Sequence, residues 1–333
     1  MYLIKFKPDR ASAEIAKNAA SYLKQNKIKN YVGNELNEKN FELVVAVGDD
    51  RFILKTFRML GKLQIPVFAI ASSQSFLAQA NALNFKYYFN LIKKTKYEVF
   101  KRSRLVARFE NATTPIGLND IGMFSSKSAS LLKYSIFLND ELFWKDSSDG
   151  IIVSTPTGST GYSLSAGGPI ILDEPNIFAL TPISSLEKHS PVVVSDATKI
   201  KITDIEGTNP VVIVDGEIRI PVRTSEILIE KSPYYANFIM FSKEYSLESK
   251  LKKRNININI GKLKCMPSSS KLIYKILVHE GVMTQKELIS ASLLPDRTVR
   301  YALNILLKAA IITSQPYFTD ARQTIYSVRH SES

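Results

Sequence analysis

The sequence contains very little cysteine and histidine, which narrows its metal and redox chemistry. Its 333 residues include one cysteine, Cys265, and three histidines, His189, His279 and His330. A single cysteine can form neither an internal disulfide nor a thiolate cluster, and it is typical of a reducing compartment. The histidines show none of the spacings that hold a metal, such as HExxH. We therefore predict no metal site.

Long hydrophobic runs are also missing. No stretch approaches the roughly eighteen consecutive apolar residues that a membrane helix needs, and the first ten residues, MYLIKFKPDR, lack the features of a signal peptide. We expect a cytoplasmic protein without membrane contacts. With 45% hydrophobic residues in a chain of this length, we expect roughly two or three domains.

Three common motifs are absent as well. The chain has no GxxxxGK[ST] phosphate loop, no GxGxxG dinucleotide fingerprint and no GxSxG nucleophile elbow. What it does have is an excess of positive charge, with 44 basic against 31 acidic residues and a net charge of +13. This excess favours polyanionic partners such as nucleic acid or nucleotide phosphates, unless it only reflects a lysine-rich surface.

The first part of the chain alternates strands with helices, which is typical of a parallel sheet. From about Lys96 the pattern changes to short strands separated by turns, and this predicts a mainly β region. We therefore place an α/β domain at 1–95 and a β-rich domain at 96–245. The elements predicted before that boundary are strands at 2–7, 41–47 and 65–71 and helices at 12–25 and after Gly48.

The last part of the chain has a different pattern. Residues 250–264 include six basic residues and no acidic one, which indicates a basic linker at 246–266. Three helices and two strands then follow, and the segment LPDRTVRYALNIL resembles the turn and recognition helix of a winged helix-turn-helix module. We predict such a domain at 267–330. Its helices are expected at 269–281, 284–292 and 297–309, the second with a capping box formed by Thr284 and Glu287.

The third helix of this module has one apolar and one polar side. Arginine and asparagine side chains can make paired hydrogen bonds to base edges, and basic residues can neutralise phosphates. We therefore predict duplex DNA as a partner and expect a homo-oligomer, although an ordinary amphipathic helix used for protein contacts has the same pattern. The candidate DNA-binding residues are Arg297, Arg300, Tyr301, Asn304 and Lys308, with Arg322 at the tip of a candidate wing.

Glycine is concentrated in one stretch, DGIIVSTPTGSTGYSLSAGGPII at 149–171. Five of the fourteen glycines lie within nineteen positions there, interleaved with serine and threonine. Glycines let a ligand approach the backbone, hydroxyl groups can bond to its polar edges, and an aromatic ring can stack on a base. The alternatives for single residues are turns, helix caps and tight packing, but the whole pattern favours a pocket for a small ligand.

This stretch closely resembles the signature of the NAD kinases, ATP-dependent enzymes that phosphorylate the adenosine 2′-hydroxyl of NAD. Three further segments occur in the order found in that family: VAVGDDRF, GLNDIG and, after the long motif, VIVDGE. The resemblance covers roughly residues 1–245. It implies an NAD kinase-like fold, with an α/β N-terminal domain and a mainly β domain, here followed by the winged helix-turn-helix domain.

The resemblance also implies roles for individual residues, with NAD or NADP as the ligand and ATP with Mg²⁺ as co-reactants if the chain is active. Asp50 would be the catalytic base. Asn119 and Asp120 match an Asn-Glu pair that holds ribose hydroxyls, with Asp one methylene shorter. Asp149 would bind the nicotinamide end of the dinucleotide. The residues expected around the adenine are Thr160, Tyr162 and Ser165.

The phosphate loop departs from the family pattern. The loop Gly-Gly-Asp-Gly-Thr is replaced by Gly48-Asp49-Asp50-Arg51-Phe52, and the segment 69–79 lacks the usual asparagine and glycines. Asp49 adds negative charge beside a polyanion, whereas Arg51 can act as a phosphate clamp. Two functions therefore remain open. One is an NAD kinase fused to a DNA-binding module, and the other is a catalytically degenerate transcription regulator that senses NAD(P).

Overall fold

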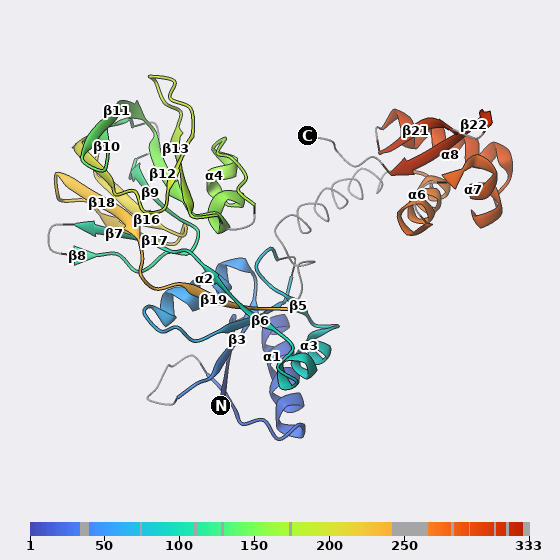
Figure 1. The fold of residues 1–333 in the computed structure, drawn as a ribbon, viewed down its shortest axis with the longest axis horizontal. Coiled ribbons are helices and arrows are strands. Elements are labelled where there is room, and N and C mark those ends of the chain that lie inside the picture. Colours follow the sequence, from blue (N-terminus) through green and yellow to red (C-terminus); the bar gives the residue numbers. More distant parts are fainter. Residues whose placement is uncertain are drawn as a thin grey trace. The chain divides into compact units, whose positions relative to one another are not determined.

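The chain folds into two compact units, Met1–Leu247 and Glu248–Ser333 (Figure 1). This is a computed structural model, and each unit is described by itself. No described helix is both long and apolar enough to cross a bilayer. The residues described are 1–33, 40–73, 75–109, 112–127, 130–172, 175–241, 266–280, 283–292, 294–309, 311–317 and 320–328.

The first unit begins with the parallel sheet that the sequence predicted. Its strand order is β2-β1-β3-β4-β19-β6, with β5 paired to β4, and only β6 runs antiparallel to its neighbour. The strands are β1 Tyr2–Phe6, β2 Asn30–Val32, β3 Leu43–Gly48, β4 Val67–Ala71, β5 Ala80–Asn81, β6 Glu98–Arg102 and β19 Ala236–Met240. The helices are α1 Arg10–Gln25, α2 Asp50–Leu60 and α3 Phe85–Lys93.

Two strands of this sheet come from parts of the sequence that we had expected in the β-rich region. β6 and β19 pair with each other over five residues, and Phe238 of β19 pairs with Val67 of β4. Strand-like sequence patterns do not specify the sheet in which a strand is placed, so the sequence could not show this. The chain thus leaves the first sheet after β6, forms strands β7 to β18 in the mainly β part, and completes the first sheet with β19.

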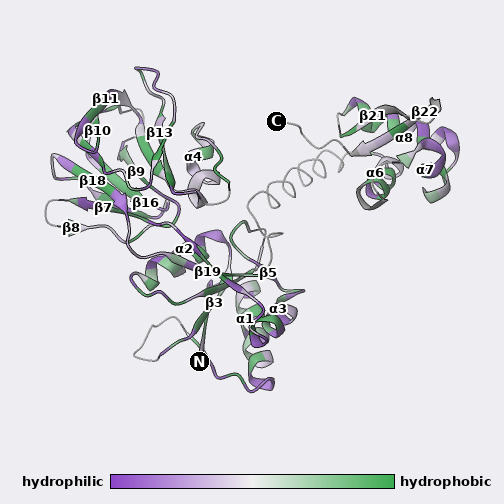
Figure 2. Cartoon of the chain, in the orientation of Figure 1, coloured by the Kyte–Doolittle hydropathy of each residue, from purple (hydrophilic) through white to green (hydrophobic). Residues whose placement is uncertain are grey.

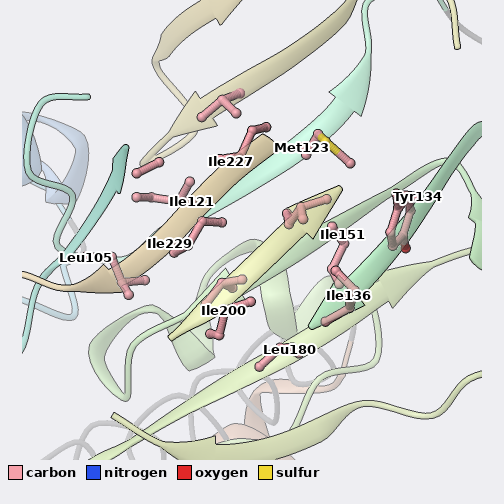
Figure 3. Close-up of a cluster of buried hydrophobic side chains, with 14 of the residues drawn as sticks. Leu105, Ile121, Met123, Tyr134, Ile136, Ile151, Leu180, Ile200, Ile227 and Ile229 are labelled. Carbon is pink, nitrogen blue, oxygen red and sulfur yellow. The ribbon is translucent and has the colours of Figure 1, made fainter. Parts of the chain in front are cut away.

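The mainly β part consists of two six-stranded antiparallel sheets, ordered β11-β10-β15-β18-β7-β8 and β14-β13-β12-β9-β16-β17. Buried residues of both sheets, including Ile121, Ile136 and Leu180, form one hydrophobic core (Figure 3). The strands are β7 Leu105–Phe109, β8 Ala112–Thr113, β9 Asp120–Ser125, β10 Leu132–Leu138, β11 Glu141–Ser148, β12 Gly150–Ser154, β13 Ile177–Ile183, β14 Val192–Ser195, β15 Ile200–Glu206, β16 Pro210–Val214, β17 Ile218–Pro221 and β18 Glu226–Lys231. Green, hydrophobic residues are visible along β13 and β18 in Figure 2.

The α/β and mainly β parts of this unit are joined at helix α2. Arg104 is almost fully buried and donates hydrogen bonds to the carbonyl oxygens of Phe57 and Gly61 at the end of α2 and to that of Ile116. In addition, Leu118 packs in the same hydrophobic cluster as Ile53 of α2. The turn that precedes β9 therefore lies against the helix that follows β3.

The second unit contains the helices and the hairpin expected from the sequence, together with a short strand between the first two helices. Ile273, Leu288 and Leu303 contribute to a core of its own. The expected capping box is confirmed, because the backbone N–H of Thr284 donates to Glu287 and that of Glu287 donates to Thr284 Oγ1. The elements are α6 Ser268–Glu280, β20 Met283–Thr284, α7 Gln285–Ser292, α8 Asp296–Lys308, β21 Ile312–Tyr317 and β22 Asp320–Val328, with sheet order β20-β22-β21. The predicted basic segment 250–264 lies outside the described residues.

Candidate functional site

The glycine-rich motif packs directly on the turn that carries Asn119 and Asp120. Thr155, at the end of β12, donates from its backbone N–H to the carbonyl oxygen of Asn119 at 2.9 Å and from Oγ1 to that of Leu118 at 2.7 Å. The chain then forms the short 3-10 helix η1, Thr157–Thr160. A Cβ atom at Gly158 would lie 1.9 Å from the carbonyl oxygen of Asn119. Glycine is therefore required at this close approach of two backbone segments.

The side chains of Asn119 and Asp120 converge beside Gly161. A Cβ atom at Gly161 would lie 3.4 Å from Nδ2 of Asn119 and 3.8 Å from a carboxylate oxygen of Asp120. Within the described part of the chain, Oδ1 of Asn119 is buried without a hydrogen-bond partner, and so is Oγ of Ser154, which pairs with Asp120 across β12 and β9. Unpaired buried polar atoms are costly, and a ligand with hydroxyl groups would relieve that cost.

The carboxyl group of Asp120 has a raised pKa. Burial raises the pKa of its carboxyl group to about 7, and the nearby carboxylate of Asp215 adds to this shift. Asp120 therefore changes charge close to neutral pH, beside the unpaired amide oxygen of Asn119.

The other predicted ligand residues lie at two places. Thr160 ends η1, and the one-turn helix α4, Tyr162–Ser165, follows directly, so these residues adjoin Gly161. The ring of Tyr162 is half exposed and stacks on Phe124 at 5.8 Å between centroids, so one face is open to a second planar group. Asp149 precedes the opposite end of β12, roughly 17 Å along the strand from Ser154. The structure does not bring Asp149 together with Asn119.

The predicted phosphate loop is organised by its two carboxylates. Gly48 ends β3, and Asp49 caps α2 by accepting the backbone N–H of Phe52 at 3.0 Å while forming an ion pair with Lys7 at 2.9 Å. Asp50 is the first residue of α2. Its carboxylate accepts the backbone N–H groups of Phe76 at 2.9 Å and Leu77 at 3.1 Å and the hydroxyl of Ser75. Arg51 is exposed next to it.

The sequence did not predict the residues that hold the two loop carboxylates and the Asn119 turn in place. Lys7 and Ser75 contact the two carboxylates of the loop, and Asp215 accepts hydrogen bonds from the backbone of the Asn119 turn. Asp215 lies in the segment VIVDGE, which we had noted only as part of a resemblance. Lys7 and Ser75 carried no signal of their own.

The described residues offer no protein-built metal centre, since no group of three or more His, Cys, Asp or Glu among them could hold a metal ion. In the second unit, α8 presents all five predicted polar residues, including Arg297 and Asn304, as exposed side chains. Arg300 is ion-paired with Asp296 on the same helix at 2.7 Å. The opposite side of α8, with Val299 and Leu303, is buried in the core. Arg322 falls in β22, and its side chain lies outside the described part.

The class of protein follows from this fold and from comparisons with known proteins. The family model for the ATP-NAD kinase C-terminal domain matches residues 118–241. The NAD kinase of Clostridium tetani is 36% identical over 225 residues, which is 65% of this chain and 81% of that protein. The NAD kinase of Flavobacterium psychrophilum is 32% identical over 221 residues, 64% of this chain and 75% of that protein. The chain belongs to the NAD kinase family.

Other relatives differ in length, and the solved structures agree on the fold. A bifunctional NADP phosphatase/NAD kinase of Methanocaldococcus jannaschii is 35% identical over 208 residues, but these are 59% of this chain and only 35% of that longer protein. The crystal structure of an NAD kinase from Archaeoglobus fulgidus in complex with ATP matches with a TM-score of 0.65 and 27% identity, covering 80% of this chain and 99% of that one. The α/β and mainly β parts therefore form an NAD kinase-like fold, as the sequence predicted.

Proposed function

We propose that the first unit binds NAD and transfers the γ-phosphoryl group of ATP to the 2′-hydroxyl of its adenosine, giving NADP. The observation that carries this proposal is the buried Oδ1 of Asn119, which lies beside Asp120 and has no hydrogen-bond partner among the described residues, at a turn shaped by Gly158 and Gly161. An amide and a carboxyl group placed together suit the paired hydroxyls of a ribose. The relatives named as NAD kinases and the related structure in complex with ATP support this assignment.

In this proposal Asn119 and Asp120 hold the ribose hydroxyls, and the half-exposed ring of Tyr162 stacks on the adenine, with Thr160 and Ser165 at its edges. Asp149 binds the nicotinamide end of the ligand. The same site accepts NADP, because the two dinucleotides differ only at the 2′-oxygen.

Phosphoryl transfer requires a base at the attacking hydroxyl. A bond forms between the 2′-oxygen and the γ-phosphorus, the bond from that phosphorus to the bridging oxygen breaks, and ADP leaves. Asp50 orients the hydroxyl and accepts its proton. The backbone at Gly48 and the exposed guanidinium of Arg51 face the phosphates. Mg²⁺ bound to the phosphates of ATP would neutralise part of their charge.

Substitution of Asn119 tests the ligand assignment. We expect isothermal titration calorimetry to detect binding of NAD or NADP, and Asn119→Ala to weaken it roughly threefold to tenfold through the loss of neutral hydrogen bonds. Asn90→Ala, an exposed residue of α3, is the control and keeps the affinity of the unmodified protein. Equal affinity of Asn119→Ala and the control contradicts the assignment.

A second candidate function is favoured by the contacts of the phosphate loop. Asp50 already accepts three hydrogen bonds from residues 75–77, and Asp49 occupies the N-terminus of α2 that glycine amides would otherwise offer to a phosphate. A protein of this kind would bind the dinucleotide without phosphorylating it and would act as an NAD(P)-sensing regulator. Dinucleotide binding without NADP formation, in an assay with ATP and Mg²⁺, selects this candidate.

In either function, the second unit would act as a DNA-binding domain. We propose that residues 267–330 form a winged helix-turn-helix domain, joined by a linker at 246–266, and that its α8 binds duplex DNA, with the chain acting as a homo-oligomer. The support is a helix with one buried apolar side and an exposed side carrying Arg297, Asn304 and Lys308, packed against a three-stranded sheet.

A salt series of DNA-binding curves on genomic fragments tests the α8 surface. Arg297→Ala is expected to reduce discrimination between fragments by about 1–3 kcal/mol if the arginine reads a base edge. Lys17→Ala, an exposed residue of α1, makes the same change in charge outside this unit and is expected to bind as the unmodified protein does. Absence of binding at low salt, or identical curves for both variants, identifies the module as a protein-contact domain.

A further inference from the structure

Asp215 is bound to the Asn119 turn through one carboxylate oxygen and its backbone N–H. Its side chain is fully buried, and Oδ1 accepts the backbone N–H groups of Leu118 at 2.9 Å, Asn119 at 2.7 Å and Asp120 at 3.4 Å. The backbone N–H of Asp215 in turn donates to the carbonyl oxygen of Asp120 at 2.9 Å. Asp215 adopts a left-handed conformation with φ 49°, which aspartate tolerates better than most residues. One carboxylate oxygen thus accepts three successive backbone N–H groups of the turn.

The second oxygen of this carboxylate contacts helix α2. Oδ2 of Asp215 accepts Nη1 of Arg58 at 2.7 Å, and the Arg58 side chain is only 6% exposed. Nη2 of Arg58 also contacts Glu217. Arg58 and Asp50 lie on the same helix, roughly 12 Å apart along its axis. A continuous series of contacts therefore connects the phosphate loop with the turn that carries Asn119.

We propose that Asp215 and Arg58 are positioning residues that fix the Asn119 turn for the dinucleotide and align it with the phosphate loop at the start of α2. This inference rests on the proposed dinucleotide site. Both side chains lie behind the turn, and they act through the backbone of Leu118, Asn119 and Asp120. A turn fixed before the ligand arrives loses less entropy on binding, and a buried arginine–carboxylate pair holds its geometry better than neutral groups do.

Asp215 also affects the protonation of Asp120. Asp215 is one of the two causes that raise the pKa of Asp120, the larger being burial. Among the described residues, the charged group that acts on Asp120 is Asp215; Asp215 is ion-paired with Arg58, which also contacts Glu217. If ionised Asp120 accepts ribose hydroxyls, affinity rises as the pH passes the pKa of Asp120. Removing the charge of Asp215 moves that midpoint to lower pH.

The test compares dinucleotide affinity, measured by calorimetry between pH 5.5 and 8.5, in the unmodified protein and in five variants. Asp215→Ala removes all acceptors, and we expect roughly 10- to 100-fold weaker binding. Asp215→Asn keeps an oxygen for the backbone donors, so it recovers part of this loss, with its pH midpoint shifted downward. Arg58→Met weakens binding in the unmodified background and has little further effect in Asp215→Asn, because it acts through Asp215.

Asp146→Asn is the matched control. Asp146 is a buried carboxylate of β11, at the end of the two antiparallel sheets away from Asn119. It accepts hydrogen bonds from the hydroxyls of Tyr134 and Ser185. We expect this variant to lower the melting temperature but to keep both the affinity and its pH midpoint. The positioning role is refuted if Asp215→Asn and Asp215→Ala bind equally and show no pH shift, or if Asp146→Asn weakens binding as much. If the unmodified protein binds neither NAD nor NADP, the proposed function itself fails, which separates the two failures.

Discussion

Replacing Asp50 with asparagine is expected to lower the rate of NADP formation by about 10²–10⁴-fold, the usual range for loss of a general base. Asparagine keeps the size and one acceptor oxygen of Asp50, so the loop at Phe76 and Leu77 keeps part of its support. It cannot accept the proton of the 2′-hydroxyl. The fall is therefore expected in kcat, with little change in the KM for NAD, in a coupled assay of NADP formation.

Asp49→Asn is the control for this experiment. Asparagine caps helices about as well as aspartate, so α2 is retained, and only the partly buried ion pair with Lys7 is lost. We expect activity within a few-fold of the unmodified protein, or an increase, since a negative charge beside the phosphates has been removed. Equal rates for Asp50→Asn and the unmodified protein show that Asp50 is not the base.

Gly158→Ala is expected to abolish dinucleotide binding. The added methyl carbon would lie 1.9 Å from the carbonyl oxygen and 2.4 Å from the carbonyl carbon of Asn119, and backbone atoms cannot move aside as a flexible side chain does. The turn must therefore shift, and the site of Asn119 and Asp120 shifts with it. Overpacking of this kind lowers the free energy of unfolding by about 1–3 kcal/mol. Calorimetry and thermal unfolding measure the two effects.

Gly167→Ala separates steric clash from the general cost of losing a glycine. Gly167 has a φ of 89° and no atom within 4 Å of an added Cβ, so alanine there meets backbone strain but no neighbour. We expect Gly167→Ala to lower the free energy of unfolding but to leave dinucleotide binding intact. If both variants bind equally well, the close approach of Gly158 to Asn119 does not shape the site.

The sequence predicted what depends on local pattern. Periodicity identified the parallel sheet and the apolar side of α8. The motif around Gly158 predicted a ligand site, and in the structure this motif packs on the backbone of Asn119. The pair of Arg58 and Asp215 was missed because 157 positions separate the two residues, and neither residue belongs to a periodic sequence pattern that would point to the other. In the same way, nothing in the strand 236–240 indicated that it pairs with β4.

That late strand has a consequence for the order in which the chain can fold. The first sheet closes only when β19 pairs with β6 and β4, and Phe238 then packs on Phe57 of α2 at 4.6 Å between ring centroids. During synthesis, about 140 residues are therefore added after residue 95 before the first sheet can be completed. Strands β7 to β18 of the two antiparallel sheets are made in this interval. Such long-range closure is slow compared with local folding. The first four strands of this sheet are therefore synthesised before the two antiparallel sheets, but their sheet is complete only after those sheets have been made.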